Sequence, residues 1–140
     1  MRDIPLGERF AKDVTLTVDE IAAFARSCGD FNPLHHDEAY ARQTRFRGII
    51  ACGPHITSLM MGMTATHFSH DGAMLGLEFT FQFRKAVKAG EPLHLAWEVI
   101  ALEPKASLHG IVLSLQGTTT DAAGTVLVTG VGKLLATDHL

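Results

Sequence analysis

The feature that most constrains the fold is a long apolar segment, residues 53–67, after which the hydrophobic period changes. The segment opens with Gly53-Pro54, and proline suits the first position of a helix. Its larger apolar residues recur at spacings of three and four, the period of an α-helix. The residues at the remaining positions of the segment are only weakly polar. Because a helix that is apolar all round is normally buried, the sequence predicts a buried central helix.

Four segments after this helix alternate between apolar and polar residues, as half-buried strands do. They are residues 75–83, 93–101, 111–115 and 126–135. Turn-forming residues separate them at 88–92, at Glu103-Pro104 and at 121–124. We therefore expect a four-stranded antiparallel meander wrapped around the long central helix. This is an α+β arrangement of the hot-dog type.

Two shorter helices are predicted upstream. Residues 18–28 have helical periodicity, with Thr17 or Asp19 available as N-cap and Glu20 in the first turn. This helix is expected to end near Gly29, and residues 37–43 are expected to form a second short helix. Between them, residues 30–35 contain Asn32-Pro33. Because a residue before proline is pushed out of the helical region, this stretch is predicted to be an ordered turn.

The composition fits one globular domain spanning residues 1–140. Of these residues 46% are hydrophobic and 19% are charged, and the formal net charge is -3 without a run of Lys or Arg, so no nucleic-acid partner is expected. No stretch reaches the roughly 18 apolar residues of a membrane span, and the N-terminus lacks the apolar core of a signal peptide. Cys28 and Cys52 are too few for a disulfide framework. A cytoplasmic protein is predicted.

Asp30 and His35 flank the turn that Pro33 stiffens, so a carboxylate and an imidazole can face one cavity. Such a pair can hold a water molecule, with one group taking a proton from it while the other delivers a proton to carbon. A structural explanation is also available, in which Asp30 caps the turn, Asn32 forms an Asx-turn and His35 is a loop histidine. On spacing alone, the structural explanation is favoured.

A longer pattern changes this balance. Residues 27–35, SCGDFNPLH, are followed by Asp37 and then by residues 46–53, FRGIIACG. Together they resemble the hydratase-2 motif of (R)-specific enoyl-CoA hydratases and MaoC-like dehydratases. Residues 83–91 resemble the strand and turn after that family's central helix, so the resemblance spans most of the chain.

The resemblance implies an activity and a role for each motif residue. In that family the Asp and His of the motif activate a water that adds across a trans-2-enoyl thioester to give an (R)-3-hydroxyacyl thioester, or catalyse the reverse dehydration. By position these residues are Asp30 and His35, and Asn32 would order the loop. Gly53 matches the glycine whose N–H binds the thioester carbonyl. A helix start independently offers unpaired N–H groups to an enolate oxygen, and glycine permits close approach.

The implied partner is an acyl-CoA thioester, and no cofactor or metal is expected because coenzyme A is part of the substrate. The adjacent His35, His36 and Asp37 do not predict a metal site, since neighbouring residues rarely converge on one ion. Three basic residues are candidates for contacts with the phosphates of coenzyme A, against the alternative of a solvated strand end. They are Arg84, Lys85 and Lys88.

The pocket differs from the family pattern at two positions. Cys52 stands where His is frequent and Ala86 where Pro is common, and both bear on the shape of the pocket near the thioester. At a helix start Cys52 could act as a nucleophile, but a small buried thiol is the favoured interpretation. Cys52, His55 and Met60 are candidates for lining the acyl pocket, against a plain role in the core.

Two other functions compete with hydration. Hot-dog thioesterases place a catalytic Asp or Glu on or near the central helix, whereas here no acidic residue occurs between Glu38 and Asp71. A non-catalytic acyl-CoA-binding protein would keep the cavity and lose the chemistry. The intact Asp30, Asn32 and His35 argue against it. Because sheet edges in so small a domain tend to pair, a homodimer or a dimer of dimers is expected.

Overall fold

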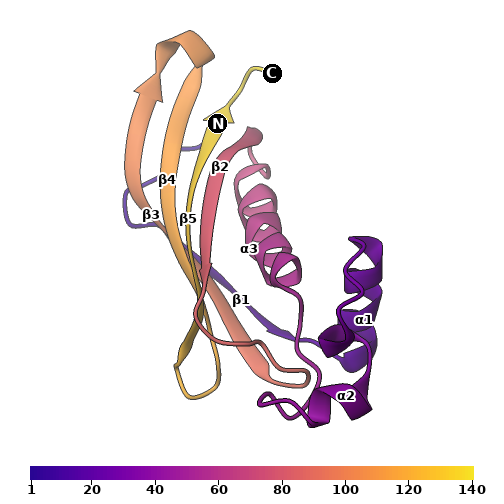
Figure 1. Ribbon diagram of the computed structural model, residues 1–140. Helices are drawn as coiled ribbons and strands as arrows, with labels where there is room; N and C mark the ends of the chain where they lie inside the picture. The colour runs from indigo at the N-terminus through magenta and orange to yellow at the C-terminus, as the bar shows by residue number, and fades with distance from the viewer.

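The computed structural model describes residues 1–140 and shows one antiparallel sheet that wraps around a long helix (Figure 1). The helix, α3 (Gly53–Phe68), lies against the inner face of a five-stranded sheet whose order is β1-β3-β4-β5-β2. The expected α+β hot-dog arrangement is confirmed. The strands are β1 (Arg9–Thr15), β2 (Ala73–Phe83), β3 (Pro92–Lys105), β4 (Gly110–Thr120) and β5 (Val126–Thr137).

The predicted upstream helices are present. Helix α1 (Val18–Ser27) starts with a reciprocal capping box between Thr17 and Glu20, so Thr17 is the N-cap. Helix α2 (Glu38–Arg42) is capped by Asp37, whose side chain accepts the N–H of Tyr40. The short 3-10 helices are η1 (Pro33–His35) and η2 (Ala106–Leu108).

The sheet corrects three expectations. Strand β1 was not predicted, because it is an edge strand on which only Phe10 and Val14 are even half-buried. Strand β2 pairs with β5 rather than β3, so the meander covers only β3, β4 and β5. Pro104 lies inside β3 instead of in a turn. Pairing with β1 ends at Glu98, and backbone bonds to residues 7 and 8 continue to Val99. Beyond Val99, β3 has a free edge where a missing N–H costs no ladder bond.

The core lies between α3 and the sheet, and glycines let aromatic rings lie close to the strands. The Trp97 Nε1–H donates to the carbonyl of Met60 on α3 at 2.8 Å. A Cβ atom on Gly117 would lie 2.5 Å from the Trp97 ring, and one on Gly130 would lie 2.7 Å from the Phe81 ring. The rings therefore occupy the space that side chains at these positions would need.

The opposite face of α3 is exposed in a single chain. Met61 on this face is 40% exposed, and Gly62 beside it is exposed as well. The expectation that the whole helix is buried is thus not met within one copy of the protein. No helix has the length and hydropathy that crossing a membrane requires. The cytoplasmic location stays a prediction.

Replacing Gly117 tests the close packing of the sheet. Gly117→Ala is expected to lower the free energy of unfolding by about 1–3 kcal/mol, measured by chemical denaturation. The added methyl group would meet both the Trp97 ring and, at 2.8 Å, the backbone oxygen of Ala96. Gly62→Ala is the matched control, since nothing lies within 4 Å of its Cβ position. There the same change is expected to stabilise α3 by about 0.5–1 kcal/mol, and similar losses at both positions would contradict this account.

Candidate active site

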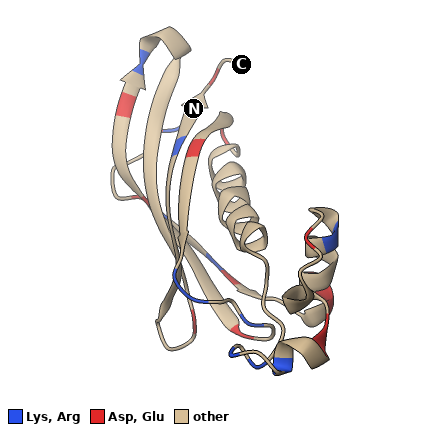
Figure 2. Cartoon of the chain, viewed as in Figure 1, with Lys and Arg blue, Asp and Glu red and all other residues tan.

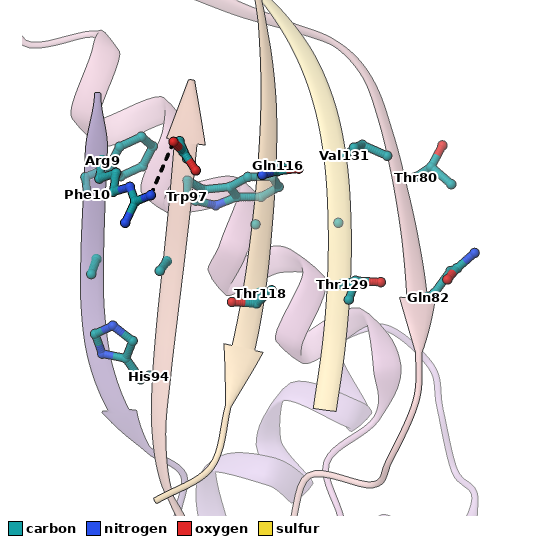
Figure 3. A pocket seen from close by; sticks show the side chains of 15 residues that line it. Arg9, Phe10, Thr80, Gln82, His94, Trp97, Gln116, Thr118, Thr129 and Val131 are labelled. Carbon is teal, nitrogen blue, oxygen red and sulfur yellow. Dashed lines mark hydrogen bonds and ion pairs between the residues drawn. The ribbon is translucent and has the colours of Figure 1, made fainter. Parts of the chain in front are cut away.

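Two hollows of the molecule are large enough for a substrate. One, of about 820 Å³, lies over the outer face of the sheet and is lined by residues from all five strands, among them three threonines and two glutamines (Figure 3). Its main charged groups are already paired, Arg9 with Glu98 and His94 with Asp13. The other, of about 890 Å³, lies at the start of α3 and brings together His35 and Gly53. We call this second hollow the α3 cavity.

Asp30 uses its two carboxylate oxygens for two different tasks. The chain leaves α1 through Gly29, which has a φ of 76°, and the Asp30 N–H then donates to the carbonyl of Ala25. The Oδ1 atom of Asp30 accepts the N–H of Asn32 at 3.0 Å, and the Asn32 side chain in turn caps η1. The Oδ2 atom lies 3.3 Å from Nε2 of His35. The predicted turn is therefore present, and it brings the Asp30 and His35 side chains next to each other.

His35 is buried, and one hydrogen bond fixes which nitrogen carries its proton. Its Nδ1 atom lies 2.7 Å from the carbonyl oxygen of Ile50. Because a carbonyl only accepts, Nδ1 must donate, and in the neutral ring Nε2 then carries the free lone pair. This lone pair can take a proton from a water held beside Asp30, whose Oδ2 atom lies 3.3 Å from Nε2.

The backbone of residues 49–51 is held from both sides. On one side the Ile50 N–H donates to Leu34, next to His35. On the other side Ala51 donates to the carbonyl of Val87, and Ala89 donates to the carbonyl of Ile49. These bonds fix the His35 loop, the start of α3 and the segment after β2 relative to one another.

Gly53 begins α3 and offers an unused donor to the α3 cavity. Its N–H donates to no protein acceptor, and Pro54 after it has no N–H at all. The His55 N–H is occupied by the carbonyl of Cys52. A free N–H at the positive end of a 16-residue helix can stabilise an oxyanion.

Basic residues line the same cavity. Several basic positions lie at the end of the molecule where α2 and the loop after β2 are found (Figure 2). The three that the sequence proposed, Arg84, Lys85 and Lys88, all line the cavity. Arg45, which sequence reasoning missed, joins them from the loop after α2. The only sequence feature that could have indicated Arg45 is its place directly before residues 46–48, FRG, of the family motif. None of the four forms an ion pair with a carboxylate. We call this group the basic rim.

Three predicted pocket residues do not line the α3 cavity. Cys52 is buried beside it, and burial raises the pKa of its thiol, which opposes formation of a thiolate. Met60 is fully buried in the core. His55 stacks on Phe24 of α1, with ring centroids 4.3 Å apart. The lining instead includes apolar residues that the sequence did not single out, among them Ile56 and Phe83.

Comparison with known proteins decides the family. Residues 6–119 match the family described as MaoC like domain. The chain belongs to this family. An (R)-specific enoyl-CoA hydratase from Aeromonas caviae is 31% identical over 101 residues, which cover 72% of this MaoC-like domain and 75% of the relative. A 3-hydroxybutyryl-CoA dehydratase from Methylorubrum extorquens is 29% identical over 103 residues, which cover 74% of this chain and 64% of the relative.

Solved structures give the same result. The MaoC-like domain matches the unliganded R-hydratase PhaJ1 from Pseudomonas aeruginosa with a TM-score of 0.86 and 27% identity, over 97% of this chain and 84% of that one. It matches the (R)-hydratase from A. caviae with the same TM-score and identity, over 96% of this chain and 98% of that one.

His55 makes stability depend on pH. Burial lowers the pKa of its imidazole, and its buried Nδ1 atom has no hydrogen-bond partner. The unfolded chain therefore binds more protons below the ordinary histidine pKa of about 6.5. The stability that depends on neutral His55 is complete above this pH and is lost as the pH falls towards the lower pKa of the folded state.

Replacing His55 with a residue that does not titrate tests this dependence. His55→Phe keeps an aromatic ring against Phe24, so the variant is expected to gain stability relative to wild type as the pH falls from about 8 to about 5. Denaturant titrations at each pH measure the difference. The value at the higher pH supplies the baseline, and a difference that stays constant would contradict the assignment.

Proposed function

We propose that this MaoC-like domain is a hydro-lyase that hydrates a trans-2-enoyl-CoA to an (R)-3-hydroxyacyl-CoA and catalyses the reverse dehydration. One observation carries the proposal. The Asp30 carboxylate lies 3.3 Å from the His35 imidazole, and His35 shares the α3 cavity with the free N–H of Gly53. The names of the A. caviae and M. extorquens relatives, a hydratase and a dehydratase acting on CoA thioesters, support the same chemistry.

The proposed reaction gives each of these groups a defined task. The thioester carbonyl accepts the Gly53 N–H, which draws electrons from the double bond and makes C3 electrophilic. A water held by Asp30 and His35 gives one proton to the pair as its oxygen bonds to C3. The electrons of the double bond move to the enolate oxygen, and the pair then returns one proton to C2. The pair ends unchanged, and no metal or cofactor takes part in the proposed reaction.

Removing either member of the pair tests the mechanism. Asp30→Asn and His35→Ala are each expected to lower hydration of a short enoyl-CoA by about 10²–10⁴-fold, followed by loss of the conjugated thioester absorbance. The asparagine oxygen can still accept the Asn32 N–H, so the turn should persist. Asp37→Asn is the matched control, because asparagine caps α2 as well as aspartate does. Unchanged rates in both site variants would refute the assignment.

The same assay separates the competing functions. A panel of enoyl-CoA substrates of different chain length and branching is tested for loss of absorbance, and release of free thiol is followed in parallel. Hydration without thiol release is expected. Thiol release would indicate a thioesterase, and tight binding without either signal would indicate a non-catalytic acyl-CoA-binding protein.

We also propose that the basic rim binds the phosphates of coenzyme A. Its four cations have no carboxylate partner, and guanidinium and ammonium groups form charge-assisted hydrogen bonds with phosphate. These cations lie on the same cavity as the Gly53 N–H, as a ligand carrying both a thioester and phosphates requires.

Substitution of the rim tests this contact. The double variant Arg84→Gln/Lys85→Gln is expected to raise KM for an enoyl-CoA by roughly 10-fold and to leave kcat nearly unchanged. KM for the corresponding enoyl-pantetheine, which lacks the phosphates, should not change. Lys12→Gln on β1 is the control, because this lysine does not line the α3 cavity. Equal effects on both substrates would exclude phosphate binding by the rim.

A homodimer is the proposed assembly. The edge of β2 is unpaired, and Leu75 and Leu77 on this strand are 46% and 52% exposed. The exposed face of α3 with Met61 is a second apolar surface. Pairing of two copies along β2 would extend the sheet and cover apolar area.

A further inference from the structure

Phe83, the last residue of β2, packs its ring against Gly53. A Cβ atom on Gly53 would lie 2.8 Å from Cζ of Phe83 and 3.1 Å from Cε1. All three of the nearest atoms to that position belong to this ring. From the sequence alone, we explained the glycine at position 53 by the close approach of a substrate. In the structure the space beside Gly53 is taken by Phe83.

Phe83 differs from the other aromatic residues of β2. Phe79 and Phe81 lie on the same face of the strand and pack against Trp97 in the core. Phe83 has no aromatic partner and is 58% exposed. A large apolar side chain in this position contributes little to the core. Its contacts are with the start of α3 and with the α3 cavity, which it lines.

Phe83 lines the same cavity as the free N–H of Gly53 and the basic rim, and Arg84 of the rim follows it directly in the sequence. Its ring also contacts the Gly53 position. A thioester whose carbonyl reaches Gly53 and whose phosphates reach the rim therefore lies in the cavity that the Phe83 ring lines.

We propose that Phe83 is a positioning residue for the thioester. Its ring walls the passage between Gly53 and the basic rim, orients the carrier arm by apolar contact and keeps water from the Gly53 N–H. A donor that is shielded from water interacts more strongly with a developing enolate oxygen. This inference rests on the proposed hydration, and it concerns the thioester end of the substrate rather than the acyl chain.

The first test compares two substitutions at Phe83. Phe83→Ala is expected to lower kcat/KM for an enoyl-CoA by roughly 10-fold or more, and Phe83→Leu, which keeps apolar bulk, should retain most of the activity. The loss should be the same factor for short, medium and long acyl chains, because the ring contacts the thioester end. A structural role alone does not predict this independence of chain length.

The second test is a double-mutant cycle with Gly53→Ala. In wild type, the added methyl group displaces the Phe83 ring, so kcat/KM should fall by roughly 10-fold. In the Phe83→Ala background the methyl group has room, and the same change should cost at most about 2-fold. Additive losses would show that Gly53 serves the substrate alone, and they would overturn the proposal.

Three other outcomes would also overturn it: unchanged kcat/KM in Phe83→Ala, a loss that grows with acyl chain length, or a loss that accompanies a changed molecular mass in solution. The last would place Phe83 in a subunit interface. His35→Ala measured in parallel separates this inference from the proposed function. If His35→Ala retains activity, the hydration mechanism fails. If His35→Ala is inactive and Phe83→Ala is not, only the role of Phe83 fails.

Discussion

The site depends on the backbone of residues 49–51, which is bonded on both sides. The Ile50 carbonyl holds Nδ1 of His35, and the Ile50 N–H bonds to Leu34. The neighbouring Ala51 bonds to Val87. This short segment is not part of a helix or a named strand, yet it joins three pieces of chain that are far apart in sequence. It fixes the orientation of the imidazole, the start of α3 and the segment that carries three of the four basic-rim residues, Arg84, Lys85 and Lys88.

A second constraint acts on the sheet. Glycines on β4 and β5 allow the rings of Trp97 and Phe81 to lie directly against the strands. The hydrogen bond from Trp97 to the Met60 carbonyl ties the middle of α3 to β3. This bond helps to fix the position of α3 relative to the sheet, and with it the position of the free N–H of Gly53.

Local patterns predicted most of the elements, and non-local packing accounts for what they missed. The central helix, α1 and α2 follow from periodicity and capping residues, which neighbouring residues determine. Strand β1 was not predicted because an edge strand buries few residues on either face. The pairing of β2 with β5 was not predicted because the register between distant segments leaves no local sequence pattern.

At the site, too, local features were predictable and non-local contacts were not. The turn between Asp30 and His35 was predictable, since Pro33 and Asn32 shape it locally. Arg45 was not, because it reaches the cavity only through the fold of its loop. His55 was expected near the pocket, but periodicity does not reveal which way the first turn of a helix faces, and its ring stacks on Phe24. The part played by the site residues in catalysis stays a prediction.

Pro104 has a consequence for how copies of this protein meet. A sheet has two edges, and each exposes backbone groups to which another strand can add. On one edge, the free part of β3 carries a proline that cannot donate, and β1 beside it carries the charged side chains of Arg9, Lys12 and Asp13. Strand addition there is discouraged. The other edge, β2, has exposed leucines and a single charged residue, Glu78, so it is the edge at which the proposed pairing of two copies would occur.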